Sequence, residues 1–546
     1  MPIQTPFSNL QALVVDDQSA QQQTLRGHLT LLGVGKVDVA SNAEDAARMI
    51  RSRPYGLILC DYNLNHKTDG QQLLEYLRDN ALLRPDCLFF MITAESTYAS
   101  VASATEHHPD TYLLKPTTAA EIGDRLTAQL EKRDALLPIN MRLAKDDLLG
   151  AVNECDKLLA LKNRWFMQAL QIKGQSLLKL GKNDEAKAIY RFALDKRADL
   201  VWAQLGLARS HKAAGEFAEA QRIAKGIIES PEGEKNVAAY DVVAETLEAQ
   251  GDSAAAMWVL RDAATVVPSA RRARIAGESA YRNGDLETAK ECMQKVAKAT
   301  KGSVVSQGQD TLLLAQAMAD LGETSEAIKV LQEGAALHKG SSSFGPTALS
   351  IQAQAEIRAG HTEAAEKTLA RARDMLRKGK ADFATVALAK AELMSGNEAA
   401  GLALLGSAIN ADHENSRVKQ MIGNTLKSTG HEDKIRAIVD SGIVLLEGKV
   451  QDARKLMRDS NIDAALNAIE AAVLEYPENT GVLLQAAQIN CMALRLKKER
   501  NIALMERAQL YLTRLDQLMP GHDRVVQMRR YFRDTVATLE ATAATH

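Results

Sequence analysis

Short apolar runs alternate with helical patterns over about the first 135 residues. Each run is bounded by polar residues or proline and is too short for a buried helix, which is typical of a strand. The five runs are residues 12–15, 36–39, 57–60, 88–92 and 112–114. Strands that alternate with helices through short connections predict a parallel sheet covered on both faces. We therefore expect a doubly wound α/β domain in this part of the chain.

Two kinds of signal predict where helices begin and end. Ser41 with Glu44, and Thr118 with Glu121, form capping boxes that predict two helix starts. The helix after Thr118 is expected to end or kink at Pro138, which has no backbone N–H and clashes with the preceding turn. We therefore expect a short domain junction at residues 134–141, with the first domain at residues 1–137.

Polar residues follow four of the predicted strands. They are Asp16–Asp17, Asp61, Thr93–Ala94 and Lys115–Pro116. The carboxyl ends of parallel strands meet at one edge of a sheet, so these residues should converge. Three carboxylates would repel one another without a cation, and oxygen ligands favour Mg²⁺. Asp61 is then the expected nucleophile, with the Thr93 hydroxyl and the Lys115 ammonium stabilising a phosphoryl group.

This set of residues resembles the receiver domain of two-component response regulators, over residues 9–133. The resemblance implies a flavodoxin-like fold with five parallel strands, and phosphorylation of Asp61 by a separate histidine kinase. It also implies that Asp17, Asp61 and the backbone carbonyl of Asn63 are Mg²⁺ ligands, with Asp16 acting largely through water.

The resemblance extends to the residues expected to respond to phosphorylation. It implies that Thr93, followed by Ala94, and Tyr112 form a switch pair. It also implies a cis peptide bond between Lys115 and Pro116. One segment departs from the family pattern: residues 62–70 are one residue longer than usual and lack the usual proline. The phosphate lifetime usual in the family therefore does not carry over to this chain.

Self-similarity marks the rest of the chain. A glycine followed five residues later by a small residue recurs at spacings near 34, which predicts a helical hairpin for each repeat. The pairs are Gly181/Ala186, Gly215/Ala220, Gly251/Ala256, Gly284/Ala289, Gly322/Ala327 and Gly360/Ala365. Gly396 and Gly430 continue the series with Gly401 and Ile435 at the alanine position, and Ser460/Ala465 continues it weakly. The glycines suit turns that need left-handed backbone, and the alanines suit close helix crossings.

These units resemble the tetratricopeptide repeat, as Gly174, Gly181, Ala186, Tyr190 and Ala193 occupy five of its signature positions. The resemblance implies an all-α solenoid of about nine to ten helix pairs over residues 138–522, followed by a capping helix and tail at 523–546. It also implies a protein-binding groove lined by the first helix of each pair. Its position nominates Gln171, Gln175, Arg209, Lys212, Arg271, Arg274 and Glu278.

Composition narrows the function. The formal net charge of −2 gives no bulk electrostatic support for nucleic-acid binding. No run of 18 apolar residues predicts membrane insertion, and we find no signal peptide. Five widely spaced cysteines suit a reducing cytoplasm, which is the expected location. No second acidic metal site or nucleophile motif predicts an enzyme beyond phosphorylation and dephosphorylation of the receiver itself.

Together, these features predict a response regulator whose output is protein binding through the repeats. Its expected partners are a histidine kinase or phosphotransfer protein and a protein or peptide on the repeat surface. A change in self-association, for instance as a homodimer, is an alternative output. A different reading makes the protein a phosphorylation-independent adaptor in which the receiver only docks other proteins.

Overall fold

The computed structural model describes residues 7–64, 68–84, 86–94, 108–231, 233–303, 305–338, 344–376, 382–412, 415–497, 501–519 and 522–543. The chain divides into two compact units. The first unit is Met1–Ser279 with Glu291–Asp310, and the second unit is Ala280–Lys290 with Thr311–His546. Within the described residues, no helix is both long and apolar enough to cross a membrane.

A five-stranded parallel sheet forms the N-terminal part of the first unit. Its strands are β1 (Gln11–Val15), β2 (Lys36–Ala40), β3 (Leu57–Asp61), β4 (Leu88–Thr93) and β5 (Thr111–Leu114). Their order in the sheet is β2-β1-β3-β4-β5, and all neighbouring pairs are parallel. Every predicted strand is therefore confirmed, as is the doubly wound fold class. Val15 pairs with Cys60 and Asp61 with Ile92, so the ends of β1, β3 and β4 lie at one edge.

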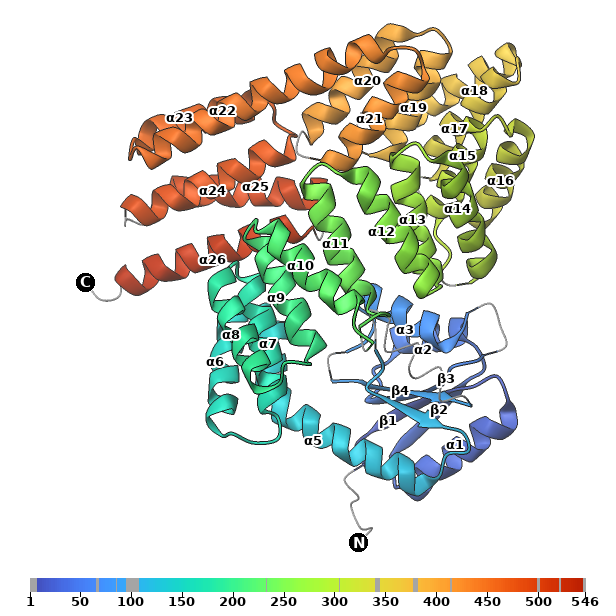
Figure 1. Cartoon of the computed structure of the whole chain (residues 1–546), viewed down its shortest axis with the longest axis vertical. Helices are drawn as coiled ribbons and strands as arrows, with labels where there is room; N and C mark the ends of the chain where they lie inside the picture. The colour runs from blue at the N-terminus through green and yellow to red at the C-terminus, as the bar shows by residue number, and fades with distance from the viewer. Residues whose placement is uncertain are drawn as a thin grey trace. The chain divides into compact units, whose positions relative to one another are not determined.

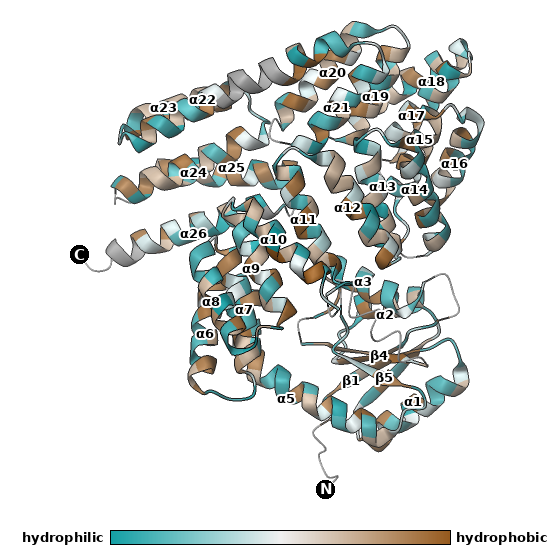
Figure 2. Ribbon diagram, viewed as in Figure 1, coloured by the Kyte–Doolittle hydropathy of each residue, from teal (hydrophilic) through white to brown (hydrophobic). Residues whose placement is uncertain are grey.

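Helices cover both faces of this sheet (Figure 1). On one face lie α1 (Ser19–Leu31) and α5 (Ala119–Ala144), and on the other α2 (Ala43–Ser52) and α3 (Gly70–Asp79). Strand β3 is buried throughout because alternate residues enter two different cores. Leu57 and Leu59 pack with α1 and α5, whereas Ile58 and Cys60 pack with α2 and α3. The strands are accordingly the brown, apolar part of this domain in Figure 2.

The helix starts agree with the sequence at one predicted position and differ at another. Thr118 caps α5 by accepting a hydrogen bond from the Glu121 N–H, as expected. The prediction at Ser41 was wrong by one residue, because Asn42 caps α2 through the Asp45 N–H. The Ser41 hydroxyl instead accepts from the Gln22 side chain, 3.2 Å away. A tertiary hydrogen bond therefore replaces the local one.

The structure contradicts an end of α5 at Pro138, since one helix runs from Ala119 to Ala144 with Pro138 inside it, whereas the alternative of a kink at Pro138 stays a prediction. An interior proline costs a helix about 3 kcal/mol. Leu136 and Ile139 on either side of it are buried with Ala151 and Cys155 of the next helix. Burial of two large aliphatic side chains contributes about 3–6 kcal/mol, which is enough to offset the proline. The receiver therefore continues into the repeats without an irregular linker.

Antiparallel helices make up the remainder of the chain (Figure 1). The first part contains α6 (Leu148–Ala160), α7 (Phe166–Lys179), α8 (Asn183–Lys196), α9 (Val201–Ala213), α10 (Phe217–Ile228), α11 (Val237–Ala249), α12 (Ser253–Val266), α13 (Ala270–Arg282) and α14 (Leu286–Thr300). There follow α15 (Gly308–Asp320), α16 (Thr324–Leu337), α17 (Phe344–Arg358), α18 (Thr362–Met375), α19 (Phe383–Met394), α20 (Glu398–Ala411) and α21 (Ser416–Ser428). Two short helices, η1 (Glu432–Lys434) and η2 (Arg436–Asp440), precede α22 (Ser441–Arg458), α23 (Ile462–Glu475), α24 (Thr480–Lys497), α25 (Ile502–Leu518) and α26 (Asp523–Ala543).

The repeat pattern predicted the turns correctly. All eight glycines of the series have positive φ values between 73° and 87°, and Ser460 continues the series with φ 60°. Positive φ costs glycine little, which explains its recurrence at these turns. The alanines five residues on are buried, for example Ala186, Ala220 and Ala256 at 0% exposure. The all-helical solenoid is therefore confirmed as the architecture that follows the receiver.

Candidate functional site

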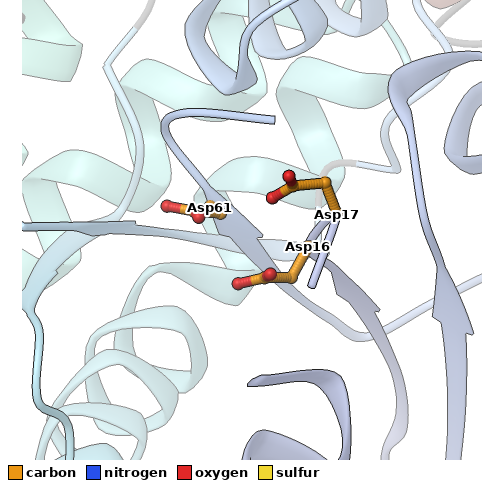
Figure 3. Close-up of side chains that lie close together, drawn as sticks. All are labelled: Asp16, Asp17 and Asp61. Atoms are coloured by element: carbon orange, nitrogen blue, oxygen red, sulfur yellow. The ribbon is translucent and has the colours of Figure 1, made fainter. Parts of the chain in front are cut away.

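Three carboxylates meet at the strand ends of the receiver (Figure 3). Asp16 and Asp17 follow β1 and Asp61 ends β3, and one ligand oxygen from each lies within 4.8 Å of the other two. Asp16 is fully buried, and Asp61 is 4% exposed. The structure therefore brings together the three acids that the strand-end argument predicted to converge.

Backbone hydrogen bonds hold these acids in place. The Asp16 N–H donates to Ala40 O at 3.2 Å, which extends the β1–β2 ladder by one residue. The Gln22 side chain of α1 donates to Asp16 O at 2.6 Å. On the other side, the Tyr62 N–H donates to Ile92 O at 2.7 Å, directly after Asp61. The backbone of Asp16 and the backbone directly after Asp61 are thus already hydrogen-bonded, which favours a preorganised site.

Lys115 supplies the positive charge at this site. Its Nζ lies 2.6 Å from Asp61 Oδ2 and 3.4 Å from Asp16 Oδ2. It follows β5, its N–H donates to Thr93 O at 2.8 Å, and its peptide bond to Pro116 is cis. This position directs the ammonium across the strand ends, where a phosphoryl group on Asp61 would develop charge.

The pKa shifts of Asp61 and Lys115 reflect burial and the neighbouring charges. Burial raises the pKa of the Asp61 carboxyl, and the hydrogen bond and charge of Lys115 only partly counteract it. Burial alone would lower the pKa of the Lys115 ammonium, but Asp61 and Asp16 outweigh that effect and the net shift is upward. These two shifts show that burial disfavours the ionised Asp61 carboxyl and that the neighbouring carboxylates favour the charged form of Lys115.

The donor set fits a divalent metal ion. Three carboxylates offer only oxygen ligands, and the single neighbouring ammonium leaves a surplus of negative charge. Hard cations with oxygen ligands match such a set. This acidic cluster could therefore bind a metal ion, with Asp16, Asp17 and Asp61 as the residues around it.

The other predicted residues of the receiver surround this cluster. Thr93 ends β4 and is 2% exposed, and Ala94 beside it is exposed. Tyr112 on β5 is half-buried, and the pKa of its phenol is raised by burial and by the charge of Tyr62. Asn63 is exposed, and its backbone N–H stabilises the ionised form of Asp61. Residues 65–67 of the lengthened loop, including His66, lie outside the described residues, as does His107.

The Asp69–Gly70 pair has a structural role that the sequence reasoning did not assign. Asp69 and Gln72 form a capping box that starts α3. The Gly70 N–H donates to Tyr62 O at 2.8 Å, which closes the loop after Asp61 on itself. A Cβ at Gly70 would lie 2.2 Å from Asp61 O, so only glycine fits there. The start of α3 therefore touches the backbone of Asp61 itself.

The residues nominated for the repeat groove do not form one free surface. Gln175 and Arg209 are exposed, and Gln171 and Glu278 are half-buried. The charges of the others are engaged within the chain: Lys212 with Glu245, Arg271 with Asp79, and Arg274 with Asp310. The groove stays a prediction; at these three positions the nominated cation pairs with an acid of this chain, a contact that a partner would have to share or replace.

Comparison with known proteins agrees with this geometry. Residues 12–127 match the response regulator receiver domain family, and residues 177–239 match a tetratricopeptide repeat family. The chain therefore contains a response regulator receiver domain at residues 12–127, followed by tetratricopeptide repeats that include residues 177–239.

Relatives of the receiver are single-domain chemotaxis proteins. The "Probable chemotaxis protein CheY" of Rhizobium etli is 29% identical over 119 residues, which cover 22% of this chain and 91% of that protein. The "Chemotaxis protein CheY-3" of Vibrio cholerae is 27% identical over 124 residues, covering 23% and 94%. A tetratricopeptide repeat protein from Parabacteroides merdae is 13% identical with a TM-score of 0.30, covering 54% of this chain and 98% of that structure. The repeat assignment therefore rests on this chain's own repeats and hairpins.

Proposed function

We propose that this protein is a response regulator of a two-component system, that Asp61 is its phosphorylated residue, and that its output is protein binding through the repeats. The observation that carries the proposal is the placement of Asp61 among Asp16, Asp17 and Lys115. A nucleophilic carboxylate, two further acids and an ammonium are the groups that phosphoryl transfer requires.

The transfer follows from the positions of these groups. An Asp61 carboxylate oxygen attacks the phosphorus of a phosphohistidine on a histidine kinase or phosphotransfer protein. The P–N bond breaks, the imidazole leaves with its electron pair, and an acyl phosphate forms on Asp61. Lys115 stays beside the new phosphoryl oxygens, and the Thr93 hydroxyl is the expected hydrogen-bond donor from β4. Mg²⁺, when bound by the three acids, would neutralise charge on the transferring group. We propose no other covalent chemistry for this chain and place it in the cytoplasm.

A cavity in the second unit supports protein binding as the output. First helices of successive hairpins surround a volume of about 360 Å³. Its apolar wall comes from Leu286, Phe383, Val386 and Met421. Helix α21 closes it, since Gln420 and Asn424 donate hydrogen bonds to Asn283 and Arg282 of the α13–α14 turn at 3.0 and 2.5 Å.

The charged residues that line this cavity indicate which kind of partner it would bind. Asp320 lies at its base and accepts from Lys390 Nζ at 2.7 Å and from Arg358 Nη2 at 3.4 Å. Tyr281 and Gln316 each donate to its other carboxylate oxygen at 3.2 Å. With Lys427 at the rim, the described residues that line the cavity include three cations and one carboxylate. An apolar cavity with a positive surplus suits a partner segment that carries acidic and apolar side chains.

Phosphorylation of purified protein tests the input. Acetyl phosphate with Mg²⁺ should retard the wild type on a phosphate-affinity gel, and Asp61→Asn should abolish the shift. Glu44→Gln, which changes an exposed acid on α2, is the matched control and should behave like the wild type. A wild-type protein that showed no Asp61-dependent shift would contradict the proposal and favour the phosphorylation-independent adaptor.

The output is tested by comparing partners of the two states. A pull-down with beryllofluoride-treated wild type and with Asp61→Asn should recover different amounts of a protein partner. Equal recovery of the same partner by both would contradict phosphorylation control while leaving the repeats as a binding surface.

A further inference from the structure

Helix α3 of the receiver and the loop before it contact the repeats within the first unit. Asp79, the last residue of α3, forms an ion pair with Arg271 at the start of α13, with an Nη1–Oδ2 distance of 3.0 Å. Thr68, in the loop after Asp61, shares a 2.6 Å hydrogen bond with Ser303, which follows α14. These two contacts join parts of the chain that are 192 and 235 residues apart. We call this contact surface the α3 joint.

One contact of the α3 joint, that of Thr68, lies close in the chain to Asp61, the proposed phosphorylation site. Thr68 is fully buried and Ser303 is 8% exposed, so their hydrogen bond is shielded from water. Two residues later the Gly70 N–H is bonded to Tyr62 O, next to Asp61. A displacement of the Asp61 backbone therefore reaches Thr68 through the hydrogen bond between Tyr62 and Gly70 and through Asp69, which lies between Gly70 and Thr68 in the chain.

The α3 joint is also loosely packed. A cavity of about 520 Å³ lies within it, with Asp69, Glu75 and Asp79 on the receiver side and Arg271 and Arg274 on the repeat side. The side chains of Arg271 and Asp79 are 32% and 46% exposed, and ion pairs so exposed contribute little. A contact with a cavity and a weak ion pair can be separated by the modest differences that a ligand or a phosphoryl group supplies.

We infer that the α3 joint docks the receiver on the repeats in the unphosphorylated protein, and that phosphorylation of Asp61 loosens it. This inference rests on the proposed function, because it names the contact through which that function is regulated. The surface involved consists of Thr68 and Asp79 on the receiver, and Ser303 and Arg271 on the repeats.

Phosphorylation is expected to loosen the α3 joint, and not to tighten it, because of the charge that it adds. Asp69 caps the start of α3, directly before Gly70, where an added Cβ would lie 2.2 Å from Asp61 O. A phosphoryl group on Asp61 adds negative charge to a site that already has a surplus, in surroundings where burial weakens screening. The added charge then repels Asp69. Movement of Asp69 displaces Thr68, its neighbour in the chain. The same coupling requires that a locked joint opposes phosphorylation, because coupling between two sites is reciprocal.

A reversible cross-link tests the inference. Thr68→Cys with Ser303→Cys, in a Cys87→Ser background, should form a disulfide under mild oxidation, since the hydroxyl oxygens they replace are 2.6 Å apart. The remaining native cysteines are buried. We expect a mobility change on a non-reducing gel that neither single variant shows. Phosphorylation by acetyl phosphate should be at least fivefold lower in the oxidised protein and should recover on reduction.

The possible results distinguish a failure of the α3 joint from a failure of the proposed phosphorylation of Asp61. Failure of the disulfide to form would overturn docking, and equal phosphorylation of oxidised and reduced protein would overturn the coupling. Either result leaves phosphorylation of Asp61 standing. If the Cys87→Ser background itself is not phosphorylated, the proposed function fails, and the inference fails with it.

A charge swap gives an independent check that does not depend on forming a disulfide. Asp79→Lys or Arg271→Glu should each expose α3 to hydrogen–deuterium exchange several-fold faster, and the double variant should return it to within about twofold of the wild type. Arg222→Glu, which breaks an exposed pair within α10, is the matched control and should leave α3 unchanged. Unchanged exchange in both single variants would overturn docking through this pair.

Discussion

The strand ends of the receiver and the cavity of the second unit both gather charged side chains, but with opposite balance. At the strand ends, Asp16, Asp17 and Asp61 outnumber Lys115. In the cavity, Arg358, Lys390 and Lys427 outnumber Asp320. A surplus of one sign of charge in a cleft attracts a ligand of the opposite sign. The sign of the surplus therefore indicates a cation for the first site and an acidic partner for the second.

The two sites also differ in how their charges are held. Asp61 is the last residue of β3 and Asp16 directly follows β1, so backbone hydrogen bonds of the sheet place them. The cations around Asp320 come from separate helices, 38 and 70 residues away in the chain, so side chains must reach across. Predictions that alter one charge at each site can break or sharpen this comparison.

Removal of the receiver's cation should have the largest effect. Lys115→Met leaves three acids without an ammonium, so phosphorylation by acetyl phosphate should fall about 100-fold, the typical cost of losing one electrostatic stabiliser of a transition state. Mg²⁺ affinity should stay the same or rise, because the competing charge is gone. Gel-shift rates and Mg²⁺ titrations measure the two effects. Parallel loss of both would show that Lys115 acts through structure, contrary to this prediction.

Removal of the buried acid from each site should change stability in opposite directions. Asp320→Ala leaves the buried Lys390 ammonium unpaired and should lower the free energy of unfolding by about 3 kcal/mol. Asp16→Ala in Mg²⁺-free buffer relieves repulsion from Asp17 and Asp61 and should raise it by about 1 kcal/mol. Urea unfolding with and without Mg²⁺ measures both. Destabilisation by Asp16→Ala without Mg²⁺ would contradict a repulsive cluster.

The smallest effect is expected at the rim of the cavity. Lys427 is exposed, so Lys427→Ala should leave stability within about 0.5 kcal/mol of the wild type. Recovery of an acidic partner in a pull-down should nevertheless fall several-fold, and more steeply at low salt. Lys196→Ala on α8, another exposed lysine, is the control. If both variants bind equally well, the rim does not contribute to partner binding.

Sequence patterns correctly predicted the features that depend on interactions between residues close together in the chain. The five strands and the turn glycines follow from periodicity and from backbone conformations that few residues adopt. Errors arose where distant contacts outweighed local preference. Ser41 bonds to Gln22 and leaves the cap to Asn42, and Pro138 stays inside α5 because Leu136 and Ile139 are buried beside it.

The sequence by itself determined the candidate phosphorylation site. Parallel strands always bring their carboxyl ends to one edge, so Asp16, Asp61, Thr93 and Lys115 could be placed together from their positions after four apolar runs. Only the tertiary structure decided the partners of the repeat charges, such as Asp79 with Arg271 and Asp320 with Lys390. In a solenoid each repeat adds a small rotation to the last, and those rotations accumulate over tens to hundreds of residues. The sequence pattern therefore identifies each repeat, but it does not give the accumulated rotation that decides which distant side chains meet.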